Sequence, residues 1–170
     1  MNNLSITINS SFGDIYRIVL SPAPNGALSE EVNSMLSDKG IEIREIIIGR
    51  TQGSRTTSQK ELHQISSWIA DRFAENPNMI LFYICDDMNP IPSRNTKSVY
   101  SKITVQEYRS KLFSRLFNTY ILSHNISGVF NLPIRIDGEG YSYFIHIIAR
   151  DKHASIVDTI SNDVLEGFGK

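Results

Sequence analysis

Two adjacent carboxylates, Asp86 and Asp87, end an apolar run of the sequence. Paired carboxylates can act as a general acid and base, or their oxygens can hold a Mg²⁺ ion. Successive side chains of a strand point to opposite faces, so an acid/base pair is not expected if the strand reaches this far. A metal-assisted phosphodiesterase or nuclease would need more oxygen ligands, and the nearby chain offers only Asn89 and Glu107. We therefore predict no metal site, and this enzyme class stays an alternative.

Arg109 is the second residue whose position could serve chemistry. Helical spacing over residues 104–122 predicts a core helix with a broad apolar face, and Arg109 falls near the middle of that face. An unpaired buried guanidinium is costly, so we expect it to reach solvent or a carboxylate, with Asp86 as its partner. The pair is either a structural clamp between helix and sheet or, together with Arg94, a site that grips a phosphate or carboxylate.

The segment 49–55 follows a predicted strand and precedes a capped helix, so its backbone N–H groups and arginines could receive a phosphate. Arg50 and Gly53 match the [QR]-x-x-G-x-[GA] pattern, and here the chain resembles the acetyltransferases of the GNAT superfamily over residues 41–122. Arg55 stands where that pattern has Gly or Ala. The resemblance implies an acyl-coenzyme A-dependent N-acyltransferase in which Arg50, Gly53 and Ser54 cradle the pyrophosphate. The residues alone also fit a solvated surface loop.

The cysteine and histidine content argues against several other classes. The single cysteine, Cys85, lies within an apolar run, which excludes a disulfide framework or a Cys-rich zinc site. The four histidines form no H-x-x-x-H or H-E-x-x-H pattern, and there is no G-x-S-x-G nucleophile motif. His146 lies on a predicted strand face with Phe144 and Ile148, and it fits a hydrogen-bonded core residue as well as a base.

Length and charge set the remaining limits. The 170 residues predict one globular domain spanning 1–170. The net charge is −1, but residues 88–136 hold seven basic side chains and one acidic one, which could match an acidic partner. Nucleic-acid binding is not expected, because the aromatic side chains of segment 104–122 lie opposite Lys111 and Arg115. A polar start and the lack of any apolar run near 20 residues favour a cytoplasmic protein without a membrane span.

Hydrophobic periodicity and helix caps predict ten elements in the order ββαβαβαββα. The predicted strands cover residues 4–8, 15–20, 41–49, 79–85, 127–136 and 141–149, and the helices cover 29–39, 58–76, 104–122 and 151–168. Hairpins at both ends with helical crossovers between them favour an α+β fold, a mixed β-sheet with N- and C-terminal hairpins and packed helices.

The preferred functional hypothesis is a non-enzymatic accessory or interaction domain of a bacterial system, which acts by binding a macromolecular partner or by self-association. It depends on the charge-segregated surface and on the lack of a convincing catalytic set. No cofactor is expected under this hypothesis. Coenzyme A enters only with the N-acyltransferase alternative, so the sequence leaves open whether the protein is an enzyme.

Overall fold

The computed structural model describes residues 4–85 and 103–168, which form a six-stranded mixed sheet with four α-helices. The strands lie in the order β1-β2-β3-β4-β6-β5. This confirms the predicted α+β fold and its order ββαβαβαββα. The elements are β1 (Leu4–Asn9), β2 (Ile15–Pro22), α1 (Glu30–Asp38), β3 (Glu42–Gln52), α2 (Gln59–Glu75), β4 (Met79–Cys85), α3 (Val105–Ser123), β5 (Val129–Gly138), β6 (Tyr141–Arg150) and α4 (Ala154–Phe168).

Several predicted boundaries move by up to three residues, and the two largest shifts have a physical reason. The third strand extends to Gln52, because it pairs with β2 in antiparallel fashion up to the Ile15–Gln52 pair, so Arg50 belongs to the strand and not to the loop after it. The last helix begins at Ala154, after a short 3₁₀ turn over Asp151–His153. Such a turn commonly leads into an α-helix.

Local sequence signals position the two helices next to the candidate site. At the start of α2, the carboxylate of Glu61 accepts a hydrogen bond from the backbone N–H of Ser58 at 3.0 Å, which forms half of a capping box. At the start of α3, the hydroxyl of Thr104 accepts from the backbone N–H of Glu107 at 3.2 Å. These caps satisfy donors that a helix start leaves unpaired, so they fix where each helix begins.

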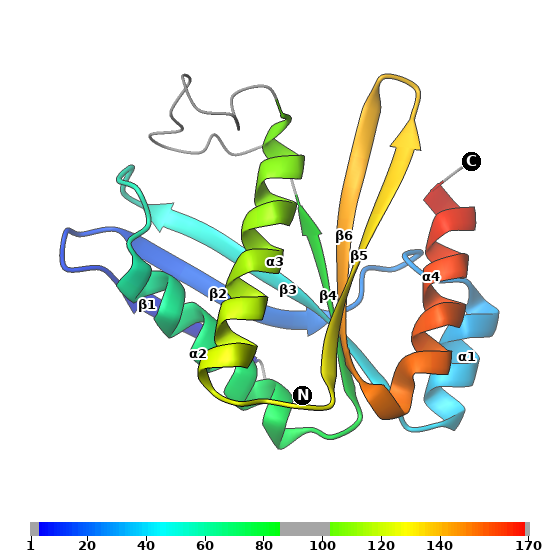
Figure 1. Ribbon diagram of the computed structural model, residues 1–170. Coiled ribbons are helices and arrows are strands. Elements are labelled where there is room, and N and C mark those ends of the chain that lie inside the picture. Colours follow the sequence, from blue (N-terminus) through cyan, green and yellow to red (C-terminus); the bar gives the residue numbers. More distant parts are fainter. Residues whose placement is uncertain (1–3, 86–102, 169–170) are drawn as a thin grey trace.

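The helices cover opposite faces of the sheet in pairs, with α2 and α3 on one face and α1 and α4 on the other (Figure 1). Because the side chains of a strand point alternately to the two faces, each central strand contributes to the hydrophobic core on both faces of the sheet. On β4, Ile80 and Phe82 pack towards α1 and α4, while Leu81 packs towards α2 and α3. A hydrogen bond of 2.7 Å from the backbone N–H of Ser29 to Oδ2 of Asp163 also joins α1 to α4.

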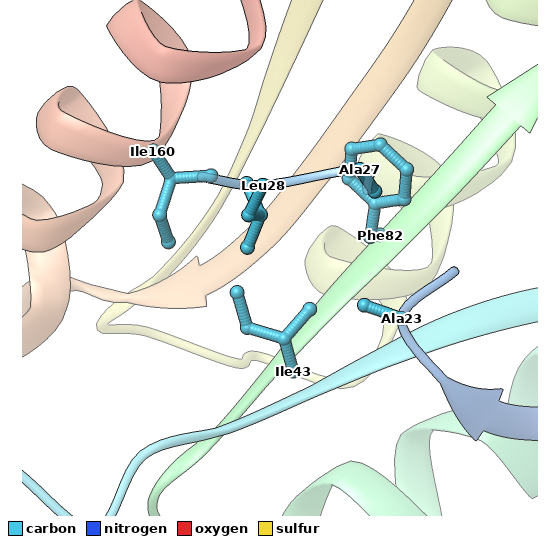
Figure 2. Close-up of a pocket in the computed structure, with 6 residues that line it drawn as sticks. All are labelled: Ala23, Ala27, Leu28, Ile43, Phe82 and Ile160. Carbon is cyan, nitrogen blue, oxygen red and sulfur yellow. The ribbon is translucent and has the colours of Figure 1, made fainter. Parts of the chain in front are cut away.

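The face under α1 and α4 is closely packed. The α4 side chains Val157, Ile160 and Val164 are at most 1% exposed. The gap found on this face is about 10 Å³, close to the smallest space that holds one water molecule. Six apolar residues surround it, among them Leu28, Phe82 and Ile160 (Figure 2). This face therefore forms an ordinary hydrophobic core.

Helix α3 does not match the core helix that its apolar pattern predicts. Among its described side chains only Ser110 is buried, while Leu112, Leu116 and Phe117 are half-buried. Helix α2 covers β1 to β3 and leaves one side of the α3 apolar face open (Figure 1). None of the described helices is both long enough and apolar enough to span a membrane.

Candidate functional site

A large groove lies between α2 and α3 above the sheet. Its volume is about 720 Å³, which falls in the range of about 300–1,000 Å³ typical of ligand pockets. Its floor includes Leu81 and Ile148, which are at most 6% exposed. Helix α2 contributes Ile65 and Ile69 to one wall, and α3 contributes Leu116 to the other. The groove therefore reaches the core of the domain.

The sheet itself opens beneath this groove. The parallel strands β3 and β4 pair only from Glu42–Met79 to Glu45–Phe82, although both strands continue further. Beyond that point β3 turns away from β4, as Figure 1 shows. The lining residues Ile48 and Arg50 of β3 and Tyr83 of β4 all lie beyond the last pair. The separation of two parallel strands thus creates the space that α2 and α3 enclose.

Part of the polar lining comes from the end of β3 and the loop that follows it. Arg50, Gly53, Ser54 and Thr57 line the groove, as do Tyr108 and Arg109 of α3. The structure thus brings four of the predicted binding residues, Arg50, Gly53, Ser54 and Arg109, to one groove. The other two, Asp86 and Arg94, lie outside the described residues, so the proposed Asp86–Arg109 clamp stays a prediction, as does any role of Asp87.

Arg50 is held in place by neighbours on three sides. Its Nη2 donates to Oγ1 of Thr57 at 3.1 Å, and the same Thr57 oxygen lies 3.0 Å from the hydroxyl of Tyr16. The guanidinium lies over the Tyr16 ring at 5.2 Å, and Nη1 lies 3.9 Å from Oδ1 of Asp14. The Arg50 side chain remains 20% exposed. These contacts hold the guanidinium in one orientation at the groove, which lowers the entropy cost of binding an anion, while Asp14 offsets part of its charge.

The loop after β3 closes over the buried carboxylate of Asp14. Oδ1 of Asp14 accepts a hydrogen bond of 3.2 Å from the backbone N–H of Arg55. Gly53 has a φ of +92°, and a Cβ atom at this position would collide with the same carboxylate. The loop geometry therefore accounts for Gly53 without a ligand, and one N–H of the phosphate-binding pattern already has a partner. The Arg55 N–H is therefore not available to an anion in the groove.

His146 lies at the centre of a buried polar cluster under α3. Its Nε2 is 2.9 Å from Oγ of Ser110, and its Nδ1 is 3.0 Å from Oδ1 of Asn131. Because Asn131 can only accept through that oxygen, Nδ1 carries the proton and Nε2 accepts from the Ser110 hydroxyl. Burial lowers the pKa of His146 to about 4, so the ring is neutral near pH 7.

This Ser–His–Asn arrangement resembles a nucleophile, base and orienting group in its contacts, but it does not open to the groove. Ser110 and His146 are 8% and 0% exposed, and neither is among the described lining residues. The ring of Phe113 lies 4.7 Å from His146 and 4.6 Å from Tyr83, and both Phe113 and Tyr83 line the groove. The aromatic rings separate the polar cluster from the groove, so the core interpretation of His146 fits.

The other histidines build no site in the described part of the chain. His63 and His124 are exposed and stacked, with ring centroids 6.1 Å apart. His153 is buried near the start of α4. No cluster of three or more metal-ligating side chains occurs among the described residues. Cys85 is 1% exposed, so its thiol has little access to solvent.

Sequence reasoning missed the groove itself. Its walls are apolar side chains, and their helical spacing signals a buried core as readily as an open cleft. No protein-family model matches the sequence, and neither a curated protein nor a solved structure matches it. The groove must therefore be interpreted from its own geometry and charge.

Proposed function

We propose that this protein binds an acyl-coenzyme A in the groove between α2 and α3. The observation that carries the proposal is the composition of this groove. Its described lining is largely apolar, includes the three arginines Arg50, Arg109 and Arg150, and includes no carboxylate. A coenzyme A thioester combines phosphates with an apolar acyl end, so it matches both properties.

The placement of the polar lining supports the same ligand. Arg50 and Ser54, which the GNAT resemblance assigns to the pyrophosphate, line the groove where β3 has separated from β4. Arg150 has a structural role, because its Nη1 and Nη2 donate to the carbonyls of Asn76 and Phe73 at 3.1 and 2.6 Å. The proposal assigns the phosphates to Arg50 of β3 and Arg109 of α3, because both line the groove.

The described lining supports binding more directly than catalysis. The titratable side chains of this lining are those of tyrosines and arginines. The described lining has no histidine or carboxylate that could act as a base for an attacking amine. The GNAT resemblance would add acyl transfer, whereas the groove itself supports the binding step.

A thermal-shift measurement with coenzyme A tests the proposal. At 100 times its dissociation constant, a ligand that binds only the folded state adds about 2.7 kcal/mol to the free energy of unfolding. The variant Ser54→Asp places a carboxylate in the groove lining and should weaken binding about fivefold through repulsion of the phosphates. The control Ser155→Asp adds the same charge to an exposed site on α4, across the sheet.

No shift at millimolar coenzyme A would contradict the proposal. Equal weakening by Ser54→Asp and Ser155→Asp would also contradict it, because the phosphates would then not lie at the loop after β3.

A second candidate is the binding of a macromolecular partner, and the exposed face of α3 favours it. Lys111 and Arg115 are exposed on α3 away from the groove, and Lys111 forms an ion pair with Glu107 at 2.9 Å. An acidic protein surface would complement these charges. Light scattering with affinity capture, comparing wild type with Arg115→Glu, tests this candidate. If the wild-type protein is monomeric and Arg115→Glu loses no captured partner, this candidate is ruled out.

A further inference from the structure

We infer that the groove takes a long acyl chain, of about the length of a lauroyl or palmitoyl group, and is not built for an acetyl group. The inference rests on the proposed function for the head group of the ligand. The evidence for a long acyl chain is independent of it. It comes from the extent of apolar lining beyond the polar segment.

The apolar lining continues far from Arg50 and from the loop after β3. On α2 it extends from Leu62 to Phe73, which spans three turns of helix, and on α3 it extends from Leu112 to Ile121. A two-carbon acyl group could contact only a small part of these walls. A chain of a dozen carbons or more could contact both.

The α3 wall has apolar side chains that no other described element fully covers. Leu112, Leu116 and Phe117 are half-buried on α3, whereas the corresponding apolar side chains of α4 are at most 1% exposed. Apolar surface left in water is unfavourable, and the domain shows on its other face that it can pack helices closely. An apolar occupant would remove this surface from water.

The polar atoms of the wall favour a chain over a peptide. Away from the loop after β3, the described lining has few hydrogen-bonding side chains, with Ser66, Tyr120 and Arg150 among them. Arg150 already donates to two backbone carbonyls. An extended peptide would bring backbone N–H and C=O groups that need partners. A hydrocarbon chain needs none. The arginines then select a chain with an anionic head, which is either a coenzyme A thioester or a free carboxylate.

The test is a calorimetric titration of the wild-type protein with coenzyme A, acetyl-coenzyme A, octanoyl-coenzyme A, lauroyl-coenzyme A and free laurate. Each ligand is used at a concentration at which the ligand is monomeric. The inference predicts that affinity rises about fourfold for each methylene that becomes buried. Lauroyl-coenzyme A should therefore bind far more tightly than the acetyl thioester. Laurate separates a free carboxylate from the thioester as the source of the chain.

Three variants locate the chain. Leu116→Glu places a charge in the groove wall and should remove the dependence on chain length, while Asn118→Glu places the same charge on the exposed side of α3 and should preserve it. Ala70→Trp fills the groove from α2 without adding charge, so it gives the same test if Leu116→Glu does not fold. Circular dichroism establishes that each variant is folded.

The possible outcomes test the long-chain inference and the proposed function separately. Equal affinities for coenzyme A, acetyl and lauroyl thioesters would overturn the long-chain inference and leave coenzyme A binding in place. Tight binding of laurate without binding of coenzyme A would support the inference and overturn the proposed function. A chain-length dependence that persists in both Leu116→Glu and Ala70→Trp would overturn the inference, because the chain would then lie elsewhere.

Discussion

The two faces of the sheet are each covered by a pair of helices, but they are packed in opposite ways. Under α1 and α4 the gap found is about 10 Å³, and the α4 side chains Val157, Ile160 and Val164 are almost fully buried. Between α2 and α3 the space is about 720 Å³, and most of the apolar face of α3 is half-buried. The same sheet therefore has one closely packed face and one open face.

The difference arises from the sheet as well as from the helices. Strands β4, β6 and β5 pair along most of their lengths, and α1 and α4 lie over this continuous part (Figure 1). On the other face, α2 and α3 lie on either side of the point where β3 and β4 separate. We therefore assign stability mainly to the first face and binding to the second. Single substitutions on the two faces should separate these roles.

The largest expected effect is on the packed face. Ile160→Ala removes a side chain that is 1% exposed and borders the small gap, so it should lower the free energy of unfolding by about 3 kcal/mol. Urea denaturation measures the change. Leu116→Ala is the matched substitution on the open face and should cost about 1 kcal/mol or less. Equal costs would mean that the two faces are packed alike.

The buried His146 should make stability depend on pH. Its pKa is about 4 in the folded protein and about 6.5 when unfolded, so the unfolded chain binds more protons between these values. This contribution is complete above pH 6.5 and is lost as the pH falls towards 4, by about 3 kcal/mol. Denaturation at pH 7, 5.5 and 4 measures it.

His146→Gln is the control for the pH experiment, because other groups also titrate in this range. The variant should be less stable at pH 7 and should lose less stability than wild type on acidification. Parallel pH profiles for the two proteins would show that His146 does not carry the effect.

Gly53 offers a smaller test of the loop that borders the groove. Gly53→Ala forces a side chain into a φ of +92° and against Asp14, and should cost about 2 kcal/mol. Gly26→Ala has a similar φ of +81° with no atom within 4 Å of the added Cβ, so it should cost about 1 kcal/mol. A cost for Gly53→Ala no larger than that for Gly26→Ala would mean that the loop does not close over Asp14.

The smallest expected effect on stability lies in the groove wall. Leu116→Glu should change the free energy of unfolding by no more than about 1 kcal/mol, because the side chain is half-buried and can turn towards solvent. The same change should abolish chain-length-dependent binding. Urea denaturation of the free protein, compared with titration by lauroyl-coenzyme A, measures both. A strong loss of stability would place Leu116 in a core and would contradict the assignment of the open face.

The fold could be predicted from the sequence because its signals are local. The capping residues Ser58 and Thr104 and the alternating apolar residues of the first and last hairpins specify where elements begin and which period they follow. The limits of β3 could not be predicted from such signals. They depend on antiparallel pairing with β2, which continues to the Ile15–Gln52 pair.

The candidate site was only partly predictable for a related reason. Arg50 and Gly53 form a short motif in the sequence, but Asp14, which contacts Arg50 and the loop after β3, lies more than thirty residues away in the chain. The contacts of His146 with Ser110 and Asn131 likewise join three separate elements. The openness of the groove depends on the distance between two helices, and no pattern within either helix encodes that distance.

Hydrogen exchange with and without lauroyl-coenzyme A distinguishes binding at the open face from binding at the packed face, because it reports on both faces in one experiment. We expect slower amide exchange in α2 and α3 and around Arg50 when the ligand binds, with little change in α1 and α4. Protection in α1 and α4 alone, or none anywhere at saturating ligand, would contradict the assignment of binding to the open face.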